Sequence, residues 1–236
     1  MRSVLVACSH GTGSPDGQAA VAGLVSAVAA SRPDLDVRAA FVDVEEPRVS
    51  DVLDSLDGLG SLDSLDNEPT RVVPLLLSAG YHVYVDLAEA VAAHADTSLA
   101  GALGPDPRLA RLLASRLHDA GLRDDDTVIL AAAGSSDTRA VADCRDVAEG
   151  LGHLIGRPSS AAYLSAAEPR LDEAVRRARS ERERSRVVVA TYLLAPGHFA
   201  DVAARCGADL VTAPLLVTGE PPPSELVDIV LERYAG

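Results

Sequence analysis

Three side chains that can bind a metal stand where predicted strands end. His10 follows an apolar strand near the start of the chain, Asp43 lies at the end of a second strand, and His82 follows a third. Ligands of open α/β sheets bind at the carboxyl ends of strands, so we expect these side chains at one edge of a sheet. Two neutral imidazoles and a carboxylate suit a borderline divalent metal such as Fe, Co, Ni or Zn, and histidine also exchanges protons near neutral pH. The pattern predicts a metal site.

Each of these residues also has a purely structural interpretation. A histidine after a strand usually caps a loop, and Asp43 can cap a helix or pair with Arg71. The occurrence of His10 and His82 at equivalent strand ends favours a shared site over two unrelated loops. Cys8 is expected in the core rather than among the ligands. Three further histidines lie on predicted helices, where we expect surface or core roles: His94, His118 and His153.

The elements that must position these residues alternate along the chain. The strands are short, apolar and not alternating in polarity, which is typical of a parallel sheet covered on both faces. An acidic low-complexity stretch, residues 57–70, is expected to form a loop. The predicted strands are Val4–Ala7, Val37–Val44, Val72–Leu77 and Leu99–Leu103. The predicted helices are Gln18–Ala30, Arg48–Leu56, Val85–Ala93 and Arg108–Ala120.

The second part of the chain repeats the first. TVILAAAGSSDTRAV (127–141) matches SVLVACSHGTGSPDG, AAYLSAAEPRLDEAV (161–175) matches AAFVDVEEPRVSDVL, and RVVVATYLLAPGHFADV (186–202) matches RVVPLLLSAGYHVYVDL. Matched strands in the same order indicate an internal duplication. We therefore expect an α/β chain of two tandem half-domains, each a four-stranded parallel sheet flanked by helices. The connection is expected near Gly121–Asp126.

The two predicted half-domains, residues 1–122 and 123–236, differ at the candidate site. The alignment pairs the three candidate residues with residues of the second half: His10 with Gly134, Asp43 with Ser165 and His82 with His198. Only a histidine remains in the second half, and its role stays open. The sequence therefore predicts an active site in the first half, a degenerate site in the second, and a monomer with pseudo-twofold halves.

Composition excludes several classes of protein. The formal net charge of −14, with no lysine, argues against nucleic-acid or anionic-membrane binding. No run of 18 apolar residues suggests a membrane span. Three cysteines without close spacing indicate a reduced, cytoplasmic protein. Gly11-x-Gly13 lacks the third glycine of a dinucleotide fingerprint, and no Gly-Lys-Ser/Thr follows, so no nucleotide is expected. Ser9 replaces the arginine that precedes the histidine of phosphohistidine mutases, which disfavours that chemistry.

Three motifs together carry a family resemblance. SHGT after the first strand, FVDVEEP at the second and PLLLSAGYHVYVD at the third resemble the sirohydrochlorin chelatases of the CbiX type, which are class II chelatases. The similarity covers nearly the whole chain and includes the tandem arrangement of the long form. It implies insertion of a divalent metal substrate, Co2+, Fe2+ or Ni2+, into sirohydrochlorin for cobalamin or sirohaem synthesis, without a nucleotide.

The resemblance also assigns roles to residues. It implies that His10 and His82 are catalytic and ligate the metal together with Asp43, at a position where the family usually has Glu. The neighbouring loops are assigned to the tetrapyrrole substrate: Gly11, Thr12, Ser14, Gly80 and Tyr81. A non-catalytic protein that binds the metal or the tetrapyrrole would share all these residues and remains the alternative.

Charge is distributed unevenly between the halves. Residues 1–107 contain five Arg and 16 acidic residues, whereas residues 108–236 contain 16 Arg and 19 acidic residues. The substrate that the resemblance implies carries many carboxylates, which an acidic half repels. We therefore expect the second half to face those carboxylates, with Arg139 and Arg170 as candidates.

Overall fold

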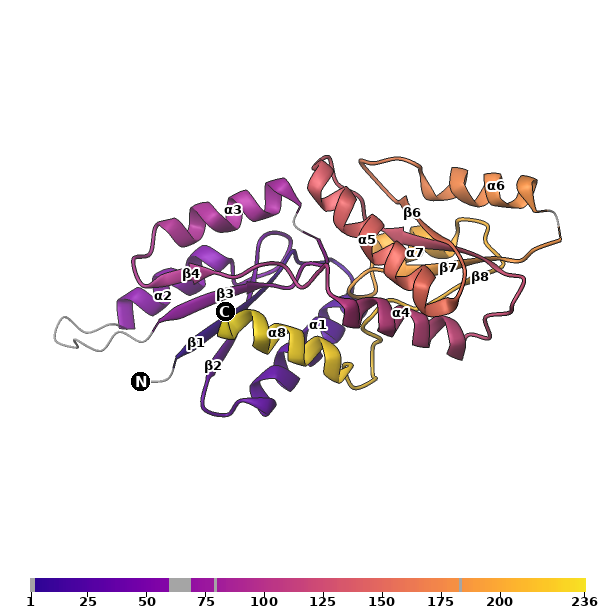
Figure 1. Cartoon of the computed structure of the whole chain (residues 1–236). Coiled ribbons are helices and arrows are strands. Elements are labelled where there is room, and N and C mark those ends of the chain that lie inside the picture. Colours follow the sequence, from indigo (N-terminus) through magenta and orange to yellow (C-terminus); the bar gives the residue numbers. More distant parts are fainter. Residues whose placement is uncertain (1–2, 60–68, 79, 183) are drawn as a thin grey trace.

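Two four-stranded, all-parallel sheets form the framework of the chain. The computed structural model describes residues 3–59, 69–78, 80–182 and 184–236. Their strand orders are the same, β2-β1-β3-β4 in one sheet and β6-β5-β7-β8 in the other, and the two lobes lie side by side (Figure 1). The predicted fold class and the internal duplication are therefore confirmed. Within the described residues, no helix is both long and apolar enough to cross a membrane.

The elements follow the predicted alternation in both halves. The first half contains β1 (Val4–Ser9), α1 (Pro15–Ser31), β2 (Asp36–Phe41), α2 (Val49–Leu59), β3 (Thr70–Pro74), α3 (Tyr81–Ala92), β4 (Thr97–Leu99) and α4 (Pro107–Asp119). The second contains β5 (Thr127–Ala132), α5 (Thr138–Ile155), β6 (Ser159–Tyr163), α6 (Leu171–Glu181), β7 (Val187–Tyr192), α7 (His198–Ala204), β8 (Leu210–Val211) and α8 (Ser224–Ala235).

Three strands of the first half end earlier than predicted, and one of them, β3, ends at Pro74 rather than Leu77. β2 ends at Phe41 rather than Val44, because the chain turns at Val44, whose φ is 67°. β4 covers Thr97–Leu99, whereas the prediction placed a strand at 99–103. Gly101 interrupts that apolar stretch and Gly104 follows it, and glycine weakens strands. Of the acidic stretch 57–70, residues 60–68 lie outside the described part of the chain.

The strand registers correct one pairing between the halves. Asp43 N–H donates to the His10 carbonyl (2.9 Å), and Ser165 N–H donates to that of Ala133 (2.8 Å), so Ala133 is the counterpart of His10. Gly134, which the alignment placed opposite His10, corresponds to Gly11. Both glycines have positive φ (95° and 93°), and a Cβ at either would lie 1.9 Å from the facing carbonyl oxygen.

A second pairing shifts by one residue in the same way. α3 begins with Tyr81 after Gly80, and α7 begins with His198 after Gly197. The preceding strands agree with this offset, since Pro74 and Thr191 pair with equivalent residues of β1 and β5. His198 therefore occupies the place of Tyr81, and the counterpart of His82 is Phe199 rather than His198.

The last helix of each half packs on the other half. α4 lies against α5 and β7 of the second half, whereas α8 lies against α1 and β3 of the first (Figure 1). One hydrophobic core therefore runs through both halves and includes Leu24, Leu113, Leu130 and Leu226. The predicted boundary at 122/123 lies between the two sequence repeats, but α4 and α8 each pack against the half on the other side of it.

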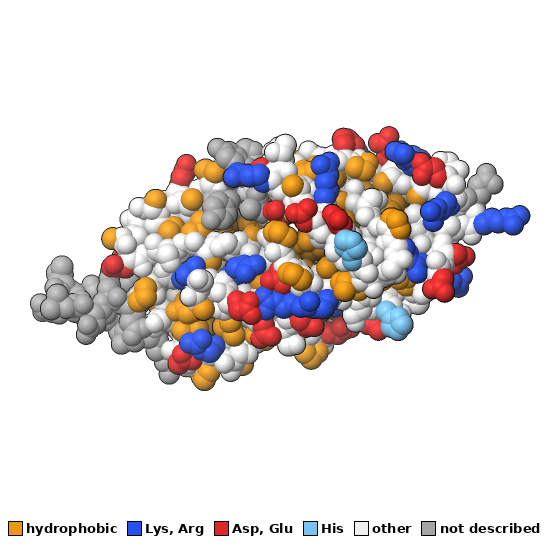
Figure 2. All heavy atoms as spheres, viewed as in Figure 1, with side chains coloured by type: hydrophobic (Ala, Val, Ile, Leu, Met, Phe, Trp, Pro, Cys, Tyr) orange, Lys and Arg blue, Asp and Glu red, His pale blue; other side chains and the backbone are white. Residues whose placement is uncertain are grey.

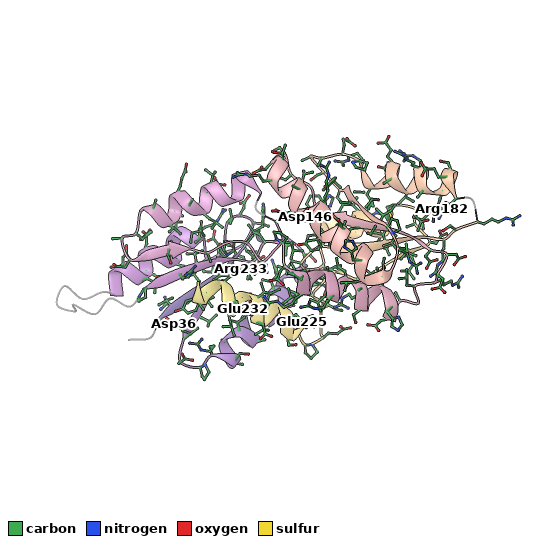
Figure 3. The ribbon with its side chains drawn as sticks, in the orientation of Figure 1. Asp36, Asp146, Arg182, Glu225, Glu232 and Arg233 are labelled. Atoms are coloured by element: carbon green, nitrogen blue, oxygen red, sulfur yellow. The ribbon has the colours of Figure 1, made fainter. Side chains whose placement is uncertain are left out.

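Arg108 links the buried Asp106 at the start of α4 to Glu232 of α8. Asp106 precedes α4 and its carboxylate accepts from the backbone N–H of Arg108 (2.9 Å) and from the Arg108 guanidinium (2.8 and 2.9 Å). Arg108 also donates to Glu232 of α8 (2.7 Å), which Figure 3 shows beside Arg233. The Arg108 guanidinium holds the pKa of the Asp106 carboxyl below its ordinary value. Asp106 is only 8 % exposed, and it holds the Arg108 guanidinium that reaches Glu232 of α8.

Substituting Asp106 with Asn is expected to lower the free energy of unfolding at pH 7 by about 2 kcal/mol, since a buried charge-assisted hydrogen bond is lost. Because the pKa of Asp106 is lower in the folded state, its stabilisation is present above about pH 4 and is lost as the pH falls below that value. The free energy of unfolding, measured with urea at pH 7 and at pH 3.5, should therefore differ less between the two pH values in the variant than in the unaltered protein.

The matched control for this prediction is Asp172→Asn. Asp172 also pairs with an arginine, Arg176 (2.7 Å), but both side chains are exposed on one helix. Exposed pairs contribute little to stability, so this variant should unfold at nearly the urea concentration of the unaltered protein. Equal effects of the two substitutions would contradict the role assigned to Asp106.

Candidate active site

A cavity of about 660 Å3 lies between the halves at the carboxyl ends of both sheets. The loops after β1, β2 and β3 line one side, and the equivalent loops after β5, β6 and β7 line the other. Much of the wall is apolar and comes from Leu75, Leu77, Leu193 and Leu194. A ligand in this cavity would touch both halves.

His10 lies in this cavity, as the sequence predicted for a residue at the end of the first strand. Its side chain is exposed, and its backbone is held by the bond from Asp43 N–H and by the close contact of Gly11 with the Asp43 carbonyl. The loop 10–14 then leads into α1, whose first turn is capped by the Ser14 hydroxyl. These contacts fix where the imidazole emerges from the sheet edge.

Glu45 is an acidic residue of the same cavity that the sequence interpretation missed. Its Oε1 accepts the backbone N–H of Thr12 (2.8 Å), and the residue is half-buried. Thr12 and His10 belong to one loop, so this bond holds the Glu45 carboxylate beside the histidine loop. A signal was present in the sequence, because a glutamate follows Asp43 by two residues in the FVDVEEP motif.

Asp43, the predicted acidic ligand, is not among the described residues that line the cavity. Its Oδ1 accepts from the Val44 N–H (2.8 Å) and from the Arg48 guanidinium (3.1 Å). The Val44 N–H, followed by Arg48, holds the pKa of this carboxyl below its ordinary value, and His10 contributes a smaller part. The carboxylate is 61 % exposed. These contacts give Asp43 a role in holding the turn that presents Glu45.

The other predicted site residues divide into three groups. Gly11, Thr12 and Gly80 line the cavity, whereas Ser14 is absent from its lining and caps α1 by accepting from Gly17 N–H (3.4 Å). Tyr81 and His82 form the start of α3, but their side chains lie outside the described part of the structure.

Arg139 and Arg170, which we expected to face the substrate, do not line the cavity. Arg139 pairs with Asp137 (3.0 Å), and Arg170 donates to the Leu164 carbonyl. Figure 2 shows arginine and acidic side chains interspersed over both lobes on the face seen in Figure 1. On that face the charge is therefore not segregated by half.

The second half contributes a different set of side chains to the cavity. His198 and Phe199, at the start of α7, line it, and their rings lie 5.7 Å apart at a tilt of 53°. The counterparts of His10 and Glu45 are alanines, Ala133 and Ala167. The second-half wall is thus mainly apolar.

The two halves approach each other closely at this cavity. A Cβ at Gly17 of α1 would lie 2.4 Å from the Pro196 carbonyl oxygen, in the loop before α7. Thr12 is a neighbour of the same loop, because a Cβ at Gly197 would lie 3.2 Å from its hydroxyl. The residues 196–199 are therefore set against the histidine loop of the first half.

Within the described residues, no group of three His, Cys, Asp or Glu side chains is close enough together to hold a metal ion. The donors that the described cavity offers from the first half are His10 and Glu45. One imidazole and one carboxylate suit a transient complex with a borderline divalent metal that other donors complete.

Comparison with known proteins agrees with this architecture. The sequence pattern of the CbiX family matches residues 4–120 and, a second time, residues 127–203. No curated protein matches the chain significantly.

Three solved structures share the fold. SirB from Bacillus subtilis with Fe3+ aligns over 100 % of this chain and 95 % of its own, with a TM-score of 0.77 and 19 % identity. The sirohydrochlorin chelatase SirB from Bacillus subtilis subspecies spizizenii in complex with cobalt aligns over 99 % of this chain and 94 % of its own, with a TM-score of 0.73 and 16 % identity. DR2241 from Deinococcus radiodurans is a multi-domain protein structurally similar to chelatases. It aligns over 99 % of this chain and 54 % of its own, with a TM-score of 0.64 and 18 % identity.

Proposed function

Because the chain belongs to the CbiX family of class II chelatases, we propose that it inserts a divalent metal, Co2+ or Fe2+, into sirohydrochlorin without a nucleotide. The observation that supports this most is the cavity between the halves, where His10 and Glu45 lie against an otherwise largely apolar wall. Its volume, about 660 Å3, lies within the range of small-molecule sites. SirB structures with Fe3+ and with cobalt are consistent with metal ions as substrates of this fold.

The reaction requires two events that these side chains suit. Two pyrrole N–H protons must leave the macrocycle as its nitrogens bind the divalent metal, and the metal must lose its water ligands. A neutral His10 imidazole can bind the incoming metal or accept a released proton, and His82 is assigned the same capacity. The Glu45 carboxylate, held by Thr12 N–H, supplies negative charge next to the metal. The apolar walls exclude water from the macrocycle.

The test is turnover under anaerobic conditions. A small amount of protein is mixed with excess sirohydrochlorin and Co2+, Fe2+ or Ni2+, and conversion is followed by the absorption spectrum. Conversion of many equivalents per protein, well above the rate without protein, is expected for Co2+ or Fe2+. Conversion of at most one equivalent would instead identify a binding protein, and the ranking of the three metals would name the preferred substrate.

Substituting His198 with Ala is expected to reduce kcat/KM by less than about tenfold. His198 lines the cavity but occupies the place of Tyr81, and the second half supplies alanines where the first half has His10 and Glu45. Initial rates at varied sirohydrochlorin concentration measure the effect. A loss as large as that of a first-half histidine variant would show that the catalytic groups come from both halves.

A further inference from the structure

Large hydrophobic side chains are rarely exposed in the described part of this chain. Three are exposed there, Val44 at 57 %, Leu154 at 51 % and Phe199 at 38 %. Val44 and Phe199 line the cavity between the halves, one from each half, whereas Leu154 lies on α5 outside it. Apolar surface exposed at a pocket costs free energy that an apolar ligand recovers on binding.

Val44 is held in the cavity wall by an unfavourable backbone conformation. Its φ of 67° lies in the left-handed region, which is rare for a β-branched residue and costs about 1–3 kcal/mol. The bond from Val44 N–H to Asp43 and the bond from Glu45 N–H to the Asp43 carbonyl (2.7 Å) maintain this turn. The same turn recurs in the second half with Ala166 (φ 52°), so the turn itself does not require a valine.

Phe199 occupies the opposite half of the same cavity. It is the second residue of α7, the place that His82 has in the first half. The neighbouring His198 ring contacts it in a tilted arrangement, which restricts how the phenyl ring turns. Its exposed ring therefore faces a space whose other wall belongs to the histidine loop.

We propose that Val44 and Phe199 are substrate-binding residues that contact the apolar surface of the flat macrocycle, Val44 from the first half and Phe199 from the second. This rests on the proposed function, because it takes the tetrapyrrole as the occupant of the cavity. The macrocycle is a large planar apolar body with carboxylates at its periphery. Exposed side chains of two halves can hold such a body while its nitrogens remain open to the metal. Both halves then contribute affinity for the macrocycle, and the first half also contributes the donor groups.

The experiment compares Phe199→Ala and Val44→Ala with Leu154→Ala as the matched control. Metal-free sirohydrochlorin is titrated into each full-length protein, and binding is followed by fluorescence. Co2+ binding to each protein is measured separately by calorimetry. Val44→Ala introduces the residue type that the equivalent turn of the second half already has at Ala166.

The expected result is a dissociation constant for the macrocycle about tenfold higher in Phe199→Ala and several-fold higher in Val44→Ala, since aromatic contact and apolar burial are both lost. Co2+ affinity of Phe199→Ala should stay within about twofold, and Phe199→Tyr should restore macrocycle binding. Macrocycle affinities equal to that of Leu154→Ala would overturn this inference alone. Absence of macrocycle binding by the unaltered protein would overturn the proposed function and this inference with it.

Discussion

Substituting His10 with Ala is expected to slow metal insertion at least ~100-fold, the low end for the loss of a positioned acid–base group. His10 lines the cavity on the same loop as Thr12, whose N–H binds the Glu45 carboxylate. Its counterpart in the second half is Ala133. His10 is exposed, so the variant should fold normally. Initial rates with saturating sirohydrochlorin and Co2+ measure the loss.

The control for this variant is His118→Ala. His118 is exposed near the end of α4 and does not line the cavity. Its rate should match that of the unaltered protein, while both variants keep the same thermal midpoint. A His10→Ala rate within a few-fold of the control would remove His10 from the proposed mechanism.

Substituting Glu45 with Gln is expected to reduce the rate about 100-fold, whereas Asp43→Asn should reduce it only a few-fold. Glu45 lines the cavity, and its glutamine analogue can still accept the Thr12 N–H through the amide oxygen, so the charge is removed and the loop is kept. The Asp43 Oδ1 instead accepts hydrogen bonds from the Val44 N–H and the Arg48 guanidinium. Initial rates and Co2+ affinity, measured for both variants, separate the two carboxylates.

The reverse ranking would restore the sequence-based assignment. If Asp43→Asn lost about 100-fold and Glu45→Gln only a few-fold, the carboxylate of the second motif would act from Asp43. Asp43→Glu adds a further comparison, since it places a longer carboxylate on the same turn. If Asp43 only holds the turn, this variant should fall between Asp43→Asn and the unaltered protein.

The fold was predictable because both halves of the chain carry the same pattern of strands and helices. Each half presents apolar strands without alternation, such as Val4–Ser9, in which all six residues are buried. Proline and a short polar residue mark the start of α1 and α4, where Ser14 and Asp106 cap the first turn. These local signals do not depend on tertiary contacts, so the succession of strands and helices along the chain could be predicted from the sequence.

The acidic residue of the cavity was harder to assign, since it depends on one backbone turn. The apolar pattern extended the second strand to Val44 and so placed Asp43 at the sheet edge. The strand ends at Phe41, and the left-handed residue at Val44 redirects the chain so that Glu45 meets Thr12. A left-handed valine has no sequence signal, because glycine and asparagine are the residues that usually mark this conformation.

The packing of α4 and α8 was equally hidden from the sequence. Both helices are amphipathic, and both sheets are apolar on both faces, so the pattern does not show which sheet a helix covers. The shared cavity follows from the same arrangement. Its second wall, with His198 and Phe199, could be found only once the two halves were placed together.

The exchange of α4 and α8 also suggests how the chain could have lost symmetry. Two separate copies of one half, each lending its last helix to the other, would form a twofold dimer whose population depends on concentration. Residues 120–126 make the same pairing intramolecular, at an effective concentration set by the length of a short connection. In a dimer of identical copies, every substitution appears on both sides of the cavity. In the fused chain one side can keep His10 and Glu45 while the other replaces them with alanine and gains an exposed Phe199.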